Sequence, residues 1–138
     1  MFASTNEVRG TSYKSRIDDL KYQFAGKTGT AQVKKITARD RELDLKTFEI
    51  PYEERDHALY VAYGPYKNPR YALSVIVEHG GSGSKVAAPI ARDIMLFQLY
   101  GGIPPITAYP EKQRLEVRKR LFDIAKKINL RTYINPNI

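Results

Sequence analysis

The segment Lys27-Thr28-Gly29-Thr30 carries residue types that can recognise a carboxylate. It lies within residues 23–33, a stretch rich in glycine, threonine and small residues whose apolar flanks predict a strand. Because side chains alternate along a strand, Thr28 and Thr30 point to one face and Lys27 to the other. Two hydroxyls on one face can hold a carboxylate, and a nearby ammonium lowers the cost of placing that anion there. Gly29 has no side chain, so a peptide can add along the edge of the strand.

The same residues do not form a phosphate-binding loop. Such a loop needs a glycine five positions before Gly26, and position 21 is lysine. The residues that follow, 31–33, continue a strand instead of opening a helix. On the tripeptide alone, a strand that contains Lys-Thr-Gly for purely structural reasons stays the alternative interpretation.

The elements that must position this segment follow from periodicity and turn chemistry. Residues 1–22 indicate a loop or short helix end, and residues 34–56 form a long charged connection with a helical turn after Pro51. Residues 57–63 and 71–78 predict two strands, and the Gly/Pro-rich residues 64–70 predict a hairpin between them.

A helix is predicted after the glycines at 80 and 81, with Ser84 as its N-cap and Gly101 as its stop. Its expected buried stripe consists of Ala87, Ile90, Ala91, Ile94 and Phe97. A proline-rich linker leads to a second helix over 111–129, with its own apolar face of Val117, Leu121, Ile124, Ala125 and Ile128. Antiparallel strands followed by a helix on one face predict an α+β fold.

Composition limits the class of protein. The chain has 138 residues, no cysteine and a net charge of +8, so it fits one domain or part of one and has no disulfide or thiolate metal site. Residues 101–138 contribute 8 Lys/Arg against 3 Asp/Glu. This basic tail indicates a solvated amphipathic helix, with nucleic acid, anionic lipid or an acidic partner as alternatives. No apolar run reaches the roughly 20 residues of a membrane span, and no signal pattern opens the chain.

The histidines and tyrosines carry no separate chemistry. His57 and His79 lie at opposite strand ends without metal-ligand spacing, so each is expected to be a capping or turn residue, and no metal site is predicted. The ten tyrosines are expected to pack rather than to stack on nucleic-acid bases.

Three segments, in this order, resemble a known family: GKTGTAQV from Gly26, DHALYVAYGPYKNPRYALSVIVEHGG from Asp56, and GSKVAAPIARDI from Gly83. They are similar to the C-terminal third of class B penicillin-binding protein transpeptidase domains, most of all to the cell-elongation type. The resemblance runs from about Gly10 to Tyr100, which makes residues 1–100 the distal part of that domain and residues 101–138 a linker and basic tail.

The resemblance implies roles for the strand. Lys27 would be the basic residue of the family's third motif, and Thr28 and Thr30 would bind the carboxylate of a D-Ala-D-Ala peptide or a β-lactam. Gly29 would let the substrate lie against the strand. The backbone N–H of Thr30 would be one of two oxyanion-hole donors. No cofactor is implied.

The family's other two motifs, Ser-x-x-Lys with the nucleophile and Ser-x-Asn, occur here only as strings. Residues 82–85 fit the first pattern but lie after the Lys-Thr-Gly strand, so they are expected to cap a helix. Residues 4–6 fit the second but lie only about 20 residues before Lys27, so the match is interpreted as a coincidence. The nucleophile is therefore expected to be absent, and the isolated chain inactive.

The sequence thus predicts a C-terminal piece of a peptidoglycan D,D-transpeptidase involved in cell-wall synthesis and cell shape. The resemblance implies a parent in the bacterial inner membrane with a periplasmic catalytic domain, partners among cell-elongation proteins, and no nucleic acid. A truncated sheet would expose an edge, so self-association is expected. The rival hypothesis is a non-enzymatic basic binding module; a nucleic-acid binder would lose affinity steeply as salt rises.

Overall fold

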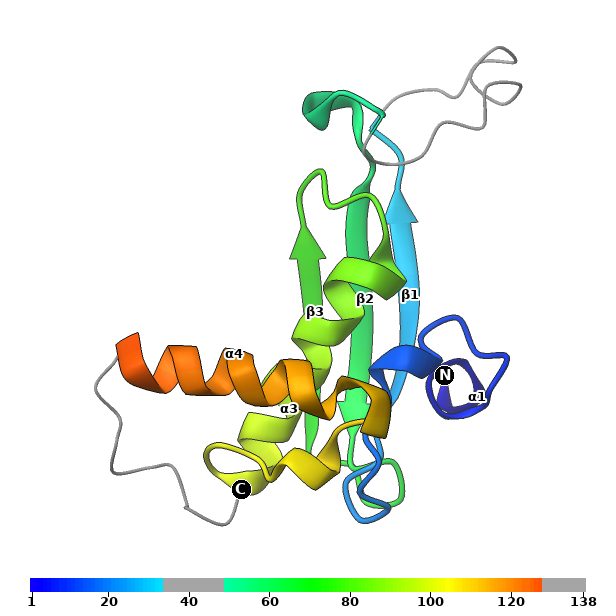
Figure 1. Cartoon of the computed structure of the whole chain (residues 1–138). Helices are drawn as coiled ribbons and strands as arrows, with labels where there is room; N and C mark the ends of the chain where they lie inside the picture. Colours follow the sequence, from blue (N-terminus) through cyan, green and yellow to red (C-terminus); the bar gives the residue numbers. More distant parts are fainter. Residues whose placement is uncertain (34–48, 128–138) are drawn as a thin grey trace.

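A three-stranded antiparallel sheet with helices on one face organises the chain (Figure 1). The computed structural model describes residues 1–33 and 49–127. The strands are β1 (Ala25–Ala31), β2 (His57–Gly64) and β3 (Tyr71–Val77). The helices are α1 (Phe2–Asn6), α3 (Ala88–Tyr100) and α4 (Arg114–Lys127). The one-turn helices are η1 (Tyr13–Ser15), η2 (Tyr52–Glu54), η3 (Gly83–Ala87), η4 (Ile106–Ala108) and η5 (Glu111–Gln113).

The strands run in the order β1-β2-β3, so β2 is central and the predicted α+β arrangement is confirmed. All three predicted strands form, although β1 is shorter than the predicted 23–33. The helical turn after Pro51 forms as η2. The predicted charged connection at residues 34–48 lies outside the described residues.

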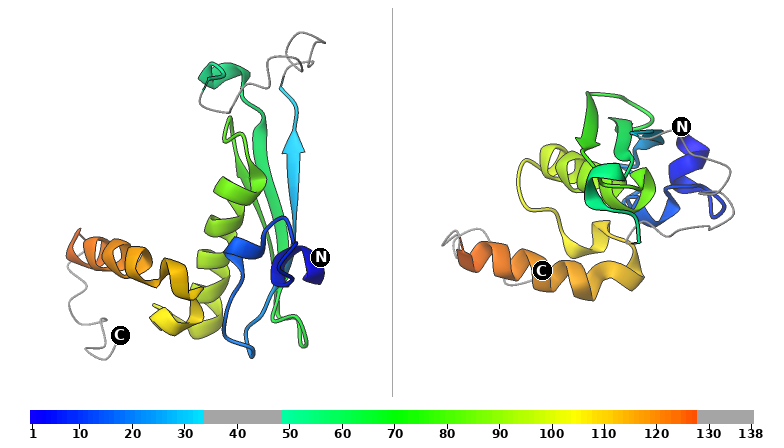
Figure 2. Two further views of the ribbon diagram at one scale, coloured as in Figure 1. Left: turned by 45° about the vertical axis from the view of Figure 1, so that its right-hand side comes forward. Right: turned by 90° about the horizontal axis from the view of Figure 1, so that it is seen from above.

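The core lies between the sheet and α3 (Figure 2). Every second residue of β2 is buried, beginning with Ala58, and Tyr60 is fully buried. These side chains meet Ala88, Met95 and other residues of α3. Among the described residues nothing covers the opposite face of the sheet, and Ile76 of β3 is 65% exposed. A sheet normally buries at least one face against another layer, and here α3 covers that face. The described residues leave the second face open to solvent.

The predicted buried stripe of α3 is partly wrong. Ala87 and Ala91 are buried as expected, but Ile94 and Phe97 are 51% and 56% exposed, and Ile90 is exposed too. The buried side instead consists of Ala88, Ala91, Arg92, Met95, Leu96 and Leu99. The helix is apolar on more than one side, so spacing alone did not identify the face that meets the sheet. The small alanines lie against the strands, where they allow the helix to approach closely.

Both ends of this helical segment are capped. Ser82, and not Ser84 as predicted, is the N-cap, and its hydroxyl accepts a hydrogen bond from the backbone N–H of Lys85 at 3.4 Å. The expectation that residues 82–85 cap a helix is therefore confirmed. Gly101 ends α3 at φ 67°, in the left-handed conformation that glycine adopts without strain.

The C-terminal segment packs on the same core. Tyr109 is buried, with the guanidinium carbon of Arg92 4.8 Å from its ring centre. On α4, Val117 is buried and Leu121 half-buried, as predicted, whereas Ile124 is exposed; the side chains of Ala125 and Ile128 lie outside the description. The division of the chain at residue 100 stays a prediction.

The exposed face of α3 gives a stability test. Leu96→Ala removes a fully buried side chain and should lower the free energy of unfolding by about 2–5 kcal/mol. Ile94→Ala, two residues earlier on the half-exposed side, should cost less than about 1 kcal/mol. Urea denaturation of both variants at equal protein concentration measures the difference. Equal losses would contradict the burial pattern of α3.

The free edge of the sheet gives a second test. β3 carries no charged residue, and its N–H and C=O groups on the outer side can pair with another chain. Ile76→Lys should reduce self-association measured by sedimentation velocity, because a lysine on an edge strand opposes pairing. Leu20→Lys, which removes an apolar side chain that is even more exposed but lies outside the sheet, is the control. If the unsubstituted chain sediments as a monomer and melts with a sharp transition, the expected self-association is refuted.

Candidate functional site

The Lys-Thr-Gly segment forms the middle of β1, at an edge of the sheet. Within residues 1–33 and 49–127, β1 pairs with β2 and with no other strand. Lys27 and Thr30 are exposed, whereas Thr28 and Gly29 are half-buried. The Nζ atom of Lys27 donates to the backbone oxygen of Thr28 at 2.9 Å. The segment is therefore accessible to a ligand along its outer side.

The register supports the alternation expected from the sequence. Thr28 and Thr30 lie opposite Tyr60 and Ala58, which are buried on the α3 side of β2. Lys27 lies opposite the exposed Val61. Directly opposite residues of an antiparallel pair share a face, so the two threonines share one face and the lysine lies on the other.

The main-chain N–H and C=O groups of β1 also alternate in direction, and the contacts of Gly26 show which residues point theirs outward. Its N–H donates to the hydroxyl oxygen of Thr5 at 3.0 Å, and that hydroxyl lies 3.3 Å from the carbonyl oxygen of Gly26. Both main-chain groups of Gly26 thus point away from β2. Since every second residue of an antiparallel edge strand points its N–H and C=O outward, the same groups of Thr28 and Thr30 point to the open side.

A buried polar cluster holds this edge in place. Thr5 on α1, Ser12 and Tyr60 are buried, and the Tyr60 hydroxyl lies 2.9 Å from the Thr5 hydroxyl and 3.2 Å from that of Ser12. Burial raises the pKa of Tyr60, and its hydrogen bonds to Ser12 and Thr5 act in the opposite direction. The Tyr60 hydroxyl therefore keeps its proton at neutral pH. Asn6 extends the attachment by donating to the backbone oxygen of Phe24 at 2.9 Å.

Two glycines are required by this packing. A Cβ on Gly26 would overlap the ring and hydroxyl of Tyr60, which lies diagonally across the sheet. A Cβ on Gly83, the first residue of η3, would lie 2.6 Å from the Leu59 carbonyl oxygen and 2.8 Å from that of Gly29. The start of η3 thus rests directly on β1 and β2, beside the β-carbon of Thr28.

Gly29 has a weaker steric requirement than these two. Its added Cβ would approach the Leu59 β-carbon at 3.3 Å, which a small shift could relieve. Sequence reasoning assigned Gly29 to substrate approach, and that assignment stays a prediction.

Sequence reasoning missed Thr5, Ser12 and Tyr60 as supports of the segment. Residues 4–6, interpreted as a coincidental match to Ser-x-Asn, lie on α1 beside β1, where Thr5 and Asn6 attach the helix to the strand. The available signal was a glycine in one strand and an inward-facing tyrosine in another. Only the register shows that the two lie diagonally across from each other.

The histidines form a turn contact at the far end of the sheet. The backbone N–H of His79 donates to Nδ1 of His57 at 2.9 Å, and His79 has a φ of 55°. This agrees with the expected capping or turn role. In the described part of the chain there is no cluster of three or more potential metal ligands. The helices of that same part are too short or too polar to cross a bilayer.

Comparison with known proteins identifies the family. The sequence model of the family described as the penicillin-binding protein transpeptidase domain matches residues 1–96. Peptidoglycan D,D-transpeptidase MrdA of Haemophilus influenzae is 35% identical over 129 residues, which cover 94% of this chain and 19% of that protein. MrdA of Salmonella typhimurium is 40% identical over 95 residues, covering 69% of this chain and 15% of that protein.

A solved structure agrees with the sequence matches. In the complex of the penicillin-binding protein PBP2 with MreC from Helicobacter pylori, a chain superposes with a TM-score of 0.54 at 35% identity. The match covers 73% of this chain and 16% of that chain. This chain therefore spans less than a fifth of the length of these relatives. Since the family model covers well over half of its residues, the chain belongs to the penicillin-binding protein transpeptidase domain family.

Proposed function

We propose that this chain is the substrate-recognition part of a peptidoglycan D,D-transpeptidase and lacks the nucleophile. The observation that carries the proposal is the open edge of β1, where two hydroxyls, an ammonium and outward main-chain groups occur within four residues. An extended peptide that ends in a carboxylate fits such an edge, since its main chain can add as a further strand.

Each residue then has a role toward the substrate. The hydroxyls of Thr28 and Thr30 donate to the terminal carboxylate of a D-Ala-D-Ala peptide or to the matching carboxylate of a β-lactam. Lys27 supplies positive charge close to that anion, and Gly29 leaves room for the substrate main chain. The outward N–H of Thr30 donates to the oxygen that becomes negative during acyl transfer, and losing one such donor typically costs about 10²–10³ in rate.

The reaction itself requires a serine outside this chain. In the parent enzyme that serine attacks the penultimate D-Ala carbonyl, terminal D-Ala leaves, and an amine of a second stem peptide takes the acyl group. A hydroxyl becomes a competent nucleophile only beside a base. Ser82 is instead bonded to the N–H of Lys85 as a helix cap, which supports placing the nucleophile elsewhere.

The same proposal includes the setting of the parent enzyme. The relatives are named peptidoglycan D,D-transpeptidases, and the Helicobacter pylori relative is in complex with MreC. We infer a parent with a periplasmic catalytic domain anchored in the inner membrane, which works with other cell-elongation proteins. The basic tail has no assigned role in this proposal.

Covalent labelling tests the missing nucleophile. A fluorescent penicillin should give no covalent adduct with the 138-residue chain, because the proposal places the activated serine outside this chain. Intact-mass spectrometry after incubation measures this result. Stoichiometric acylation of a single serine would contradict the proposal.

Carboxylate recognition has its own test. An acylated D-Ala-D-Ala peptide should shift the amide NMR signals of residues 27–30, and Thr28→Val with Thr30→Val should weaken binding about tenfold or more. The reason is that a hydrogen bond to a charged group contributes about 1.5–3 kcal/mol. Ser74→Ala, which removes an exposed hydroxyl on β3, is the matched control and should leave the affinity unchanged. Shifts confined to residues outside β1 would contradict the assignment.

A further inference from the structure

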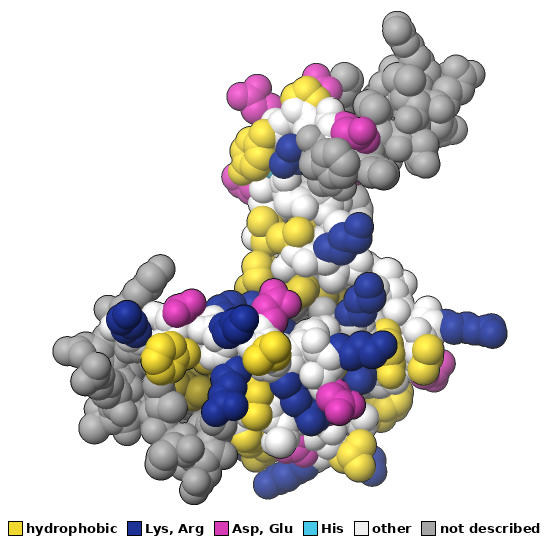
Figure 3. Space-filling model, in the orientation of Figure 1, with side chains coloured by type: hydrophobic (Ala, Val, Ile, Leu, Met, Phe, Trp, Pro, Cys, Tyr) yellow, Lys and Arg dark blue, Asp and Glu magenta, His cyan; other side chains and the backbone are white. Residues whose placement is uncertain are grey.

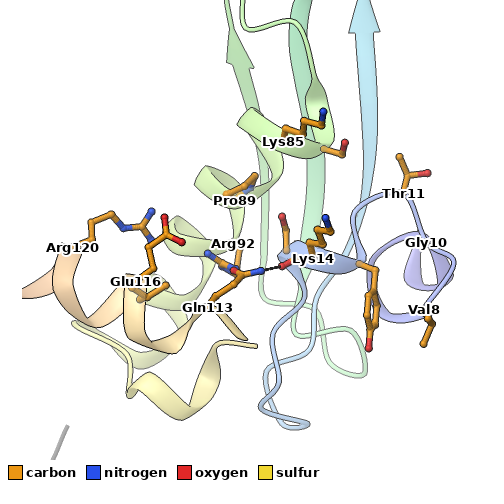
Figure 4. Close-up of a pocket in the computed structure, with 14 residues that line it drawn as sticks. Val8, Gly10, Thr11, Lys14, Lys85, Pro89, Arg92, Gln113, Glu116 and Arg120 are labelled. Carbon is orange, nitrogen blue, oxygen red and sulfur yellow. Dashed lines mark hydrogen bonds between the residues drawn. The ribbon is translucent and has the colours of Figure 1, made fainter. Parts of the chain in front are cut away.

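A cationic cavity lies away from the outer edge of β1, between η1, the start of the α3 segment and α4 (Figure 4). Its volume is about 650 Å³, and it is partly open to solvent. Figure 3 shows several Lys and Arg side chains on α4 and on the neighbouring surface, with fewer Asp and Glu among them. The cavity shares no lining residue with the Lys-Thr-Gly segment, so its interpretation is independent of the proposed function.

The charges around the cavity do not cancel. Four cationic side chains line it, from Lys14, Lys85, Arg92 and Arg120, together with one carboxylate, from Glu116. A second carboxylate, from Asp93, bonds to Arg92 and Arg120 from outside the lining. Four positive charges against two negative ones leave a local charge of +2, which favours a dianion.

Arg92 is the buried residue at the bottom of the cavity. The residue is only 2% exposed; its Nε donates to Asp93 at 3.1 Å and its Nη1 to Gln113 at 2.7 Å. For its Nη2 no acceptor is found within residues 1–33 and 49–127. Gln113 also donates to the backbone oxygen of Lys14 at 2.6 Å, which ties η5 to η1. A buried guanidinium held by two neighbours, with donors left over, is preorganised for an oxyanion.

Two ammonium groups complete the arrangement. Lys14 and Lys85 come from η1 and η3, and no ion-pair partner is found for either among the described residues. In the view of Figure 4, Lys14 lies beside Arg92 and below Lys85. Thr11 and Ser84 also line the cavity, and the Ser84 hydroxyl lies 3.3 Å from that of Ser82.

We propose that this cavity binds a phosphate monoester group on a larger polar molecule. Such a group carries about −1.5 to −2 charge at neutral pH and three acceptor oxygens, which matches the local charge and the Lys14, Lys85 and Arg92 donors. The cavity is larger than a bare phosphate, so it has room for the organic part of a phosphomonoester. A soluble phosphomonoester and a lipid headgroup with a terminal phosphate share this chemistry.

Titration calorimetry of the 138-residue chain with glycerol phosphate, at pH 7.5 and 0.15 M salt, tests the proposal. Lys14→Gln with Lys85→Gln should weaken binding about tenfold or more, because two charge-assisted hydrogen bonds are lost. Arg118→Gln with Lys119→Gln removes the same charge from exposed positions of α4 outside the cavity and should change the affinity less than about twofold. All four positions are exposed, so the variants should fold.

A substitution that should strengthen binding gives a stricter test. Glu116→Gln removes the lining carboxylate and should strengthen binding several-fold, whereas a merely structural cavity would not respond in this direction. Acetate, a monoanion, should bind more weakly than inorganic phosphate. Thermal melting with each ligand gives a second readout, since a ligand that binds only the folded state raises the melting temperature.

Vesicles distinguish the two sources of the phosphate. Binding of free glycerol phosphate supports a soluble ligand, whereas binding only to phosphatidylcholine vesicles that contain phosphatidate supports a lipid headgroup. In either case, the double substitution Lys14→Gln with Lys85→Gln must weaken the binding. The proposal is overturned if neither probe binds, if the α4 control variant loses as much affinity, or if acetate equals phosphate.

Discussion

The hydroxyl of Thr5 is the contact on which the candidate site depends. β1 is an edge strand, and main-chain N–H and C=O groups buried without partners are costly. Thr5 satisfies both groups of Gly26, and the hydroxyl of Tyr60 reaches Thr5 beneath the strand. The edge is thereby closed at Gly26 and left open from Thr28 onward. The accessible part of the strand begins where the attachment to α1 ends.

This arrangement explains how the chain can hold β1 in a defined position. The chain spans less than a fifth of its relatives, and its described residues leave one face of the sheet uncovered. Yet β1 is held on three sides, by β2, by α1 and by the start of η3. Ile76 and Phe97 lie on the surfaces that remain open. The open apolar surface and the fixed edge are thus separate properties of the same sheet.

Local patterns predicted most of the fold. Alternating residues in β2 and β3, the Gly/Pro turn between them and the stop at Gly101 act over a few positions, so the sequence contains them in full. The buried face of α3 was only partly predicted, because Ile94 and Phe97 are as apolar as the residues that face the sheet. Ser82 was passed over as the cap because two serines precede the helix, and the choice depends on how the chain leaves the sheet.

The candidate site divides in the same way. Lys27, Thr28, Gly29 and Thr30 were found from residue types and spacing, since strand alternation decides which side chains share a face. Thr5, Ser12 and Tyr60 could not be found, because they meet only after three segments have assembled. Thr5 lies 21 positions before Gly26, its hydrogen-bond partner, and such a pair produces no periodic pattern in the sequence. The residues proposed to bind the ligand are thus visible in the sequence, whereas the residues that hold them in position emerge only from the tertiary structure.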